Sequence, residues 1–157
     1  MVTKILMVCL GNICRSPLAE GILRSKVNAE EVMVDSAGTA AYHIGEAPDL
    51  RSIMTARKHG INISKLVGRQ FQESDFDEFD KIYVMDHANL SHVMGMARNE
   101  SDKAKIDLIL NELSPGSNQD VPDPYYGGDE GFEQVYRLLE SASNTIVDKI
   151  NDGRIGS

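Results

Sequence analysis

The feature that most constrains the fold is a short segment in which an apolar run ends in a loop. Residues 3–10, TKILMVCL, form an almost continuous apolar run, which is typical of a strand buried on both faces of a parallel sheet. Residues 16–30 follow as an amphipathic helix, with Ser16 expected as the N-cap and Pro17 at the first helical position. The segment therefore predicts a strand, a tight loop and a helix in immediate succession.

The rest of the chain repeats this alternation of strands and helices. Further strands are expected at residues 31–39, 81–85 and 103–110, and further helices at residues 47–60, 87–99 and 132–152. The long stretch between the last strand and the last helix is rich in proline and glycine and has no periodicity. The pattern predicts one α/β domain over residues 1–157 with a parallel, twisted sheet. Ligands bind beyond the carboxyl ends of the strands in such sheets, where the loop after Cys9 is expected.

Composition and charge argue against nucleic acid and membranes as partners. The chain has 157 residues, of which 41% are hydrophobic and 25% charged, as in ordinary soluble domains. Its net charge of −8 argues against non-specific binding to nucleic acid or to anionic membranes. No apolar run reaches the roughly 18 residues of a transmembrane helix. The two closely spaced cysteines do not resemble a secreted disulfide framework, so a cytoplasmic location is expected.

The loop itself combines a thiol with features that favour an anion. Five residues separate Cys9 from Arg15, and inward backbone N–H groups and the helix dipole place positive charge at such a turn. Gly11 and Asn12 tolerate unusual backbone conformations, and the planar Arg15 guanidinium can hold two phosphate oxygens. The same field stabilises a Cys9 thiolate.

We therefore expect the whole loop to bind phosphate, with Ser16 donating a hydrogen bond to the Cys9 sulfur. The loop residues assigned to this role are Leu10, Gly11, Asn12, Ile13, Cys14 and Ser16. Such a loop supplies a nucleophile and an oxyanion cradle together, and phosphoryl transfer to sulfur requires both.

Other interpretations of the two cysteines are weaker. Each cysteine taken singly is also compatible with a small hydrophobic side chain beside a buried strand. A thioredoxin-like redox pair has two intervening residues, whereas four separate Cys9 from Cys14. The histidines show no zinc-ligand spacing, so no metal is expected.

Residues 8–20, VCLGNICRSPLAE, closely resemble the signature of the low-molecular-weight protein tyrosine phosphatases. The segments DSAGT, RKHGI, VMDHANL and DPYYGG follow in that family's order. The resemblance implies a flavodoxin-like, four-stranded parallel sheet with helices on both faces. It also implies hydrolysis of phosphotyrosine proteins or small aryl phosphates through a phosphocysteine on Cys9, without metal or cofactor. A monomer is expected.

A proton donor is also needed, because the leaving phenolate is a strong base. The last loop offers Asp120, Asp123 and Asp129, and Pro124 restricts Asp123 to extended conformations. The resemblance implies that Asp123, in DPYYG, is the general acid. It then acts as the base for the water that hydrolyses the phosphocysteine.

Tyr42 and Tyr125 are candidates for the walls of a slot that admits a phenyl ring. The alternative for both is a surface tyrosine that shields the core. Tyr83 and Tyr136 lie within an expected strand and helix, so they are predicted to be structural.

Asn12 and Ser36 resemble family positions that support the loop. Many relatives carry a histidine shortly before the RQ pair, whereas this chain has Leu66 near that place. We therefore expect the loop to be supported differently. No histidine is assigned to the site: His43, His59, His87 and His92 are predicted to be surface or cap residues.

Two competing functions use a similar loop. A thioredoxin-coupled arsenate reductase needs further cysteines, and the chain has none after Cys14. A non-catalytic phosphotyrosine-binding module would not need both Cys9 and Asp123. Their joint presence favours catalysis. Cys14 is further predicted to capture an oxidised Cys9 as a disulfide, with simple packing beneath the loop as the alternative.

Overall fold

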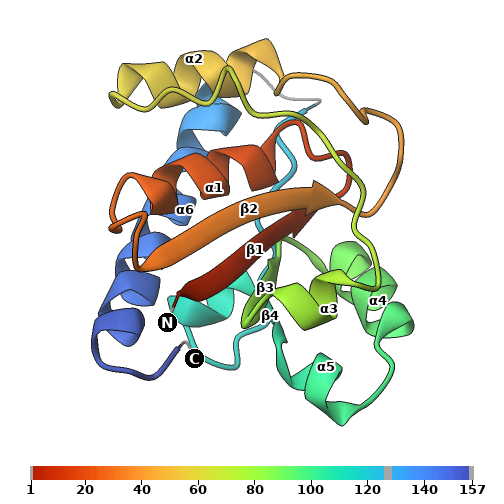
Figure 1. Cartoon of the computed structure of the whole chain (residues 1–157). Coiled ribbons are helices and arrows are strands. Elements are labelled where there is room, and N and C mark those ends of the chain that lie inside the picture. The colour runs from red at the N-terminus through yellow and green to blue at the C-terminus, as the bar shows by residue number, and fades with distance from the viewer. Residues whose placement is uncertain (1, 126–128, 156–157) are drawn as a thin grey trace.

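The fold is a four-stranded parallel sheet with helices on both faces (Figure 1). The computed structural model describes residues 2–125 and 129–155, with the backbone alone for Asp129. The strands are β1 (Thr3–Cys9), β2 (Val32–Gly38), β3 (Lys81–Val84) and β4 (Ile106–Leu108), in the order β2-β1-β3-β4. Every neighbouring pair is parallel. The predicted fold class is therefore confirmed.

Helices cover the two faces of the sheet. They are α1 (Arg15–Arg24), α2 (Leu50–Lys58), α3 (Asp75–Glu78), α4 (His87–Met96), α5 (Glu100–Ala104), the 3-10 helix η1 (Ile109–Glu112) and α6 (Asp129–Asn151). Figure 1 shows α1, α2 and α6 on one side of the sheet and α3, α4 and α5 on the other.

Alternate residues of β1 belong to the two cores on either face of the sheet. Ile5, Met7 and Cys9 pack with residues of α1, α2 and α6. Leu6 and Val8 pack with residues of α3 and α4. Both faces of β1 are buried, which explains why this run of the sequence has no polar alternation.

Some predicted boundaries are wrong. The N-cap of α1 is Cys14, without a side-chain hydrogen bond, so Ser16 lies within the helix. The hydroxyl of Ser16 is instead bonded to Asn12 and Cys9. Helix α1 also ends at Arg24, and β4 is shorter than expected because the chain turns into η1 at Ile109. Helices α3 and α5 were not predicted, since four or five residues are too few to show a helical period.

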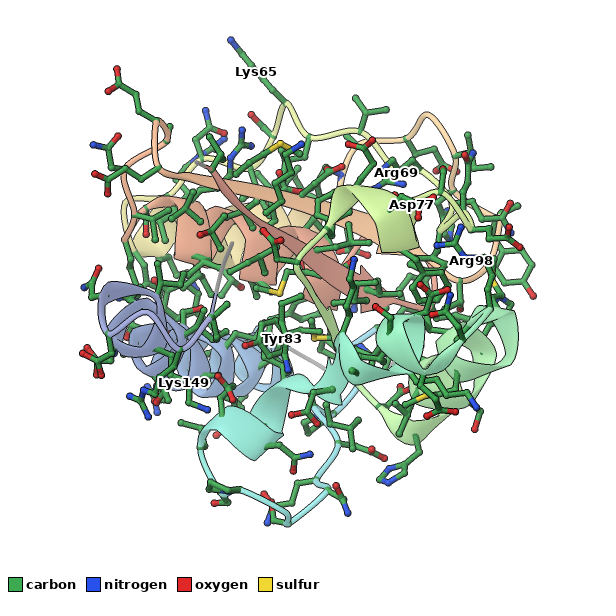
Figure 2. All side chains as sticks on the ribbon, turned by 60° about the horizontal axis from the view of Figure 1, so that its bottom comes forward. Lys65, Arg69, Asp77, Tyr83, Arg98 and Lys149 are labelled. Atoms are coloured by element: carbon green, nitrogen blue, oxygen red, sulfur yellow. The ribbon has the colours of Figure 1, made fainter. Side chains whose placement is uncertain are left out.

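Tyr83 and Tyr136 are buried, as predicted for structural residues. The Tyr83 hydroxyl donates to Glu112 Oε2 at 3.1 Å, and Lys149 Nζ donates to Glu112 Oε1 at 2.8 Å. Glu112 thus joins Tyr83 of β3 and Lys149 of α6, both labelled in Figure 2, to η1. Tyr136 stacks on His59 with ring centroids 3.8 Å apart, which joins α6 to the end of α2.

The strand order places the switch point of the sheet between β1 and β3. The chain leaves β1 through α1 to reach β2 on one side, whereas β3 lies on the other side. A crevice forms between the carboxyl ends of two such strands. Cys9 ends β1, and Asp86 follows two residues after the end of β3. Among the described residues, no helix has the length and apolar character to span a membrane.

Candidate active site

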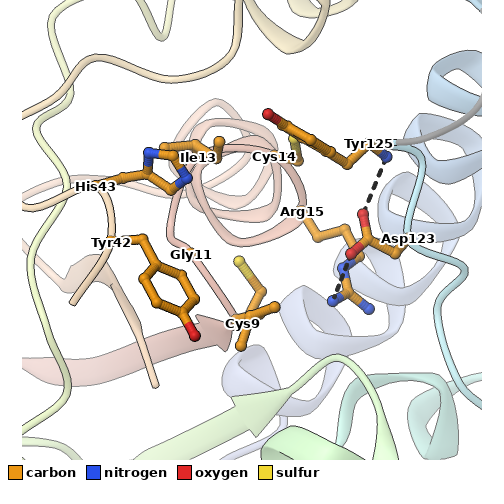
Figure 3. Close-up of a pocket in the computed structure, with 10 residues that line it drawn as sticks. Cys9, Gly11, Ile13, Cys14, Arg15, Tyr42, His43, Asp123 and Tyr125 are labelled. Carbon is orange, nitrogen blue, oxygen red and sulfur yellow. Dashed lines mark hydrogen bonds and ion pairs between the residues drawn. The ribbon is translucent and has the colours of Figure 1, made fainter. Parts of the chain in front are cut away.

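A cavity of about 190 Å³ opens above the carboxyl end of β1 (Figure 3). Its lining residues are Cys9, Leu10, Gly11, Ile13, Cys14, Arg15, Tyr42, His43, Asp123 and Tyr125. Tyr42 and His43 lie on one side, and Tyr125 and Asp123 on the other (Figure 3). Segments far apart in the sequence therefore meet at one place. Of the predicted site residues, Asn12, Ser16 and Ser36 are not among those that line the cavity.

Cys9 lies at the bottom of the loop and is only 3% exposed. Its Sγ is 3.0 Å from Ser16 Oγ. A thiolate can only accept a hydrogen bond, so the serine hydroxyl is the donor when the sulfur is charged. This contact stabilises negative charge on the sulfur that faces the cavity.

Asn12 holds the loop in shape from behind. Its φ of 56° is left-handed, a conformation that asparagine tolerates. Its Nδ2 donates to Ser16 Oγ at 2.8 Å and to Ser36 Oγ at 2.9 Å, and its Oδ1 accepts from the Arg69 backbone N–H at 3.0 Å. These hydrogen bonds hold the loop in its conformation.

Gly38 allows β2 to approach this loop closely. A Cβ atom at that position would lie 2.8 Å from the Leu10 carbonyl oxygen. A larger residue would therefore displace the loop, so the glycine of DSAGT has a steric role.

Glu20 is a buried part of the support that the sequence did not reveal. It is 3% exposed, and its Oε1 accepts from Ser36 Oγ at 2.6 Å while its Oε2 pairs with Arg24 Nη1 at 2.9 Å. Burial raises the pKa of Glu20, and the hydrogen bond from Ser36 opposes this shift. Leu66 packs against the core instead. In the described residues the loop is thus supported through Asn12, Ser36 and Glu20.

Arg15 is held in place by acceptors on two other segments. It is 2% exposed, and its Nη1 donates to Asp86 Oδ2 at 2.8 Å and to the Val121 carbonyl at 2.9 Å. Burial lowers the pKa of Arg15, but Cys9, Asp86 and Asp123 together raise it above its ordinary value. The guanidinium is therefore charged and fixed in orientation.

Asp86 is a second residue that sequence reasoning missed. Besides binding Arg15, its carboxylate accepts from the Asn89 backbone N–H and caps α4. The available signal was its place just after β3, at the same sheet edge as Cys9.

The candidate acids differ in position. Asp123 Oδ2 lies 3.6 Å from Arg15 Nη2, and Asp123 Oδ1 accepts from the Tyr125 backbone N–H at 3.0 Å. Asp120 instead lies 2.6 Å from His87 Nδ1 and does not line the cavity. The side chain of Asp129 is outside the described residues, as is Tyr126. Of Asp120 and Asp123, the geometry favours Asp123.

Cys14 is buried and packs with Ile13 and Phe132. Burial, followed by the charges of Asp49, Cys9 and Asp123, raises the pKa of its thiol to about 12. Cys14 therefore keeps its proton at neutral pH. Both cysteines are free, and the protective disulfide stays a prediction.

The aromatic residues of the cavity differ in exposure. Tyr42 is 74% exposed and Tyr125 is 39% exposed, so both present ring surface at the mouth. His43, to which the sequence assigned no role in the site, also lines the cavity, with Nδ1 3.0 Å from Glu46 Oε2. Within residues 2–125 and 129–155, no group of three His, Cys, Asp or Glu side chains is placed to bind a metal.

Comparison with known proteins agrees with this site. A sequence model described as low molecular weight phosphotyrosine protein phosphatase matches residues 4–154. The Schizosaccharomyces pombe protein of that name is 40% identical over 152 residues, covering 94% of this chain and 96% of its own.

Solved structures match over nearly the whole chain. A protein tyrosine phosphatase from Entamoeba histolytica, with Hepes in its active site, has a TM-score of 0.89 at 36% identity, covering 97% of this chain and 99% of its own. A Drosophila arginine phosphatase has a TM-score of 0.86 at 32% identity, covering 94% and 98%. The resemblance seen in residues 8–20 is thus confirmed, and the chain belongs to the low molecular weight phosphotyrosine protein phosphatase family.

Proposed function

We propose that the protein is a tyrosine phosphatase that hydrolyses phosphotyrosine and small aryl phosphates through a phosphocysteine on Cys9. The observation that carries this proposal is the meeting of Cys9, Arg15 and Asp123 in one cavity. A nucleophile, a fixed cation and a carboxyl group are the three groups that the reaction needs.

In the first step the Cys9 thiolate attacks phosphorus, and the bond from phosphorus to the aryl oxygen breaks. Asp123, protonated at this stage, gives its proton to the departing oxygen. Arg15 and the backbone N–H groups of the loop stabilise the charge on the transferring phosphoryl group. Phenol leaves, and the phosphoryl group is bonded to sulfur.

In the second step the Asp123 carboxylate takes a proton from water as the water oxygen attacks phosphorus. The bond from phosphorus to sulfur breaks, and its electron pair returns to Cys9. Ser16, whose Oγ lies 3.0 Å from that sulfur, stabilises the thiolate as it re-forms. Inorganic phosphate leaves, and Asp123 is protonated again.

The walls of the cavity suit an aryl group as the second half of the substrate. Tyr42, Tyr125 and Ile13 offer ring and aliphatic surface, which suits a phenyl ring. Aromatic rings also stack on guanidinium groups, and a similar Drosophila protein is an arginine phosphatase, so phosphoarginine has to be compared directly.

A substrate panel tests the proposal. We expect kcat/KM for a phosphotyrosine peptide to exceed that for matched phosphoarginine and phosphoserine peptides by at least about a hundredfold, the scale at which a site rejects an ill-fitting group. Cys9→Ser should abolish turnover and keep phosphate binding. A preference for phosphoarginine, or full activity in Cys9→Ser, would contradict the proposal.

The chemistry also bears on the cellular location and the oligomeric state. Cys9 must remain a thiol to act, so we place the protein in the cytoplasm, where thiols stay reduced. A monomer suffices for the reaction, because every proposed group comes from one chain.

A further inference from the structure

The start of α2, with its N-cap Asp49, contacts both the phosphate-binding loop and the segment that carries Asp123. The Asp49 backbone N–H donates to the Ile13 carbonyl at 2.8 Å, and Ser52 Oγ donates to the Cys14 carbonyl at 3.3 Å. Both acceptors belong to the loop between Cys9 and Arg15. The start of α2 is therefore anchored to the phosphate-binding loop.

Arg51, in the same turn, reaches the segment that carries the candidate acid. Its Nη2 donates to the Tyr125 carbonyl at 2.9 Å. Its guanidinium carbon lies 5.4 Å from the centroid of the Tyr125 ring and 4.7 Å from that of the Phe132 ring. Arg51 thus contacts the acid segment and the start of α6 together.

The orientation of Arg51 is fixed by the N-cap residue of α2. Nε and Nη2 donate to the two Asp49 carboxylate oxygens, each at 3.1 Å. This fork requires a planar guanidinium, which lysine lacks. These two hydrogen bonds orient the guanidinium, although the side chain is about one-third exposed.

The Tyr125 residue is held from both sides. Its N–H donates to Asp123 Oδ1 at 3.0 Å, while its carbonyl accepts from Arg51. We propose that Arg51 is a positioning residue for the general acid: it fixes Tyr125, and Tyr125 orients the Asp123 carboxyl over the Cys9–Arg15 loop. This inference rests on the proposed function.

A residue that positions Asp123 affects proton donation to the leaving group and leaves phosphate binding unchanged. Small displacements of a reacting group cost large factors in rate. Phenyl phosphate has a poor leaving group, phenolate. We therefore expect Arg51→Gln to lower kcat/KM for this substrate by about 10- to 100-fold. Para-nitrophenyl phosphate, whose leaving group needs little protonation, should lose less than about threefold. The inhibition constant of inorganic phosphate should stay unchanged.

Matched variants separate positioning from stability. Arg57→Gln removes the same charge from an exposed position of α2 and should affect neither substrate. Arg51→Lys keeps the charge without the fork, and it should shift leaving-group dependence in the same direction as Arg51→Gln. In an Asp123→Ala background, Arg51→Gln should cause no further loss for phenyl phosphate, because residues that act as one unit are not additive.

Three results would overturn the inference. They are an equal loss for both substrates, a full additional loss in the Asp123→Ala background, and wild-type leaving-group dependence in both Arg51 variants. Wild-type protein that hydrolyses neither aryl phosphate would instead refute the proposed function itself.

Discussion

At the scale of the residue, the orientation of the Arg15 guanidinium matters as well as its charge. Asp86 and the Val121 carbonyl occupy Nη1, so the planar group is turned in one way only. Its Nη2 is directed to the side on which Asp123 lies. A lysine at this position would carry the same charge but could not bind two phosphate oxygens side by side.

We predict that Arg15→Lys loses about 10²- to 10³-fold in kcat/KM, the usual cost of removing one transition-state donor. Arg15→Ala should lie within about tenfold of the lysine variant, because both lack the fork. Steady-state kinetics with para-nitrophenyl phosphate would measure both. A near-normal kcat in Arg15→Lys would show that only the charge is used.

At the scale of the element, a buried carboxyl joins α1 to β2. Glu20 comes from α1, and its partner Ser36 comes from β2. Burial raises the pKa of Glu20 above its ordinary value of 4.5. The folded state therefore binds this proton more tightly than the unfolded state does.

The sign of the pH effect follows from this shift. The contribution of Glu20 to stability is greatest below its unfolded pKa of 4.5 and declines as pH rises through the higher folded pKa. Glutamine does not ionise. We predict that the free energy of unfolding of Glu20→Gln, measured relative to wild type, rises with pH across this window.

Urea unfolding at a series of pH values would measure the difference. Glu30→Gln removes an exposed glutamate from the turn after the same helix, and its profile should run parallel to that of wild type. If Glu20→Gln also runs parallel, the carboxyl of Glu20 is not perturbed by folding.

The elements nearest the site were predictable, because local signals determine them. The apolar run of β1, the glycine of the next loop, and the arginine and proline of the first turn of α1 indicate strand, anion loop and helix directly. The N-cap of α1 was assigned wrongly because Ser16 is a good capping residue by type. Its hydroxyl instead bonds Asn12 and the Cys9 sulfur, and no local pattern shows that competition.

Residues that join the site from other elements could not be identified in the same way. Asp86, Glu20 and Arg51 act through contacts with segments distant in sequence. Each is a charged residue on a helix or at its end, where most such residues face solvent. His43 enters the cavity through the fold of a loop that has no periodicity.

At the scale of the whole molecule, the strand order explains why the groups meet. The switch point between β1 and β3 brings the Cys9 loop and Asp86 to one crevice. The segment before α6 then crosses the same edge, with the Val121 backbone N–H bonded to the Met85 carbonyl at 2.7 Å. Asp123 is thereby placed two residues beyond a fixed point on the sheet edge.

In the proposed mechanism Cys9 carries the phosphoryl group during turnover, and this intermediate can be captured. Asp123→Ala removes the base of the second step, so the phosphocysteine should accumulate when para-nitrophenyl phosphate supplies a leaving group that needs no acid. The reaction would be quenched in the steady state, digested and examined by mass spectrometry. We expect the mass of one added phosphoryl group on the Cys9 side chain, and none in the Cys9→Ser, Asp123→Ala double variant. A phosphoryl group on another residue, or an active enzyme that never carries one, would contradict it.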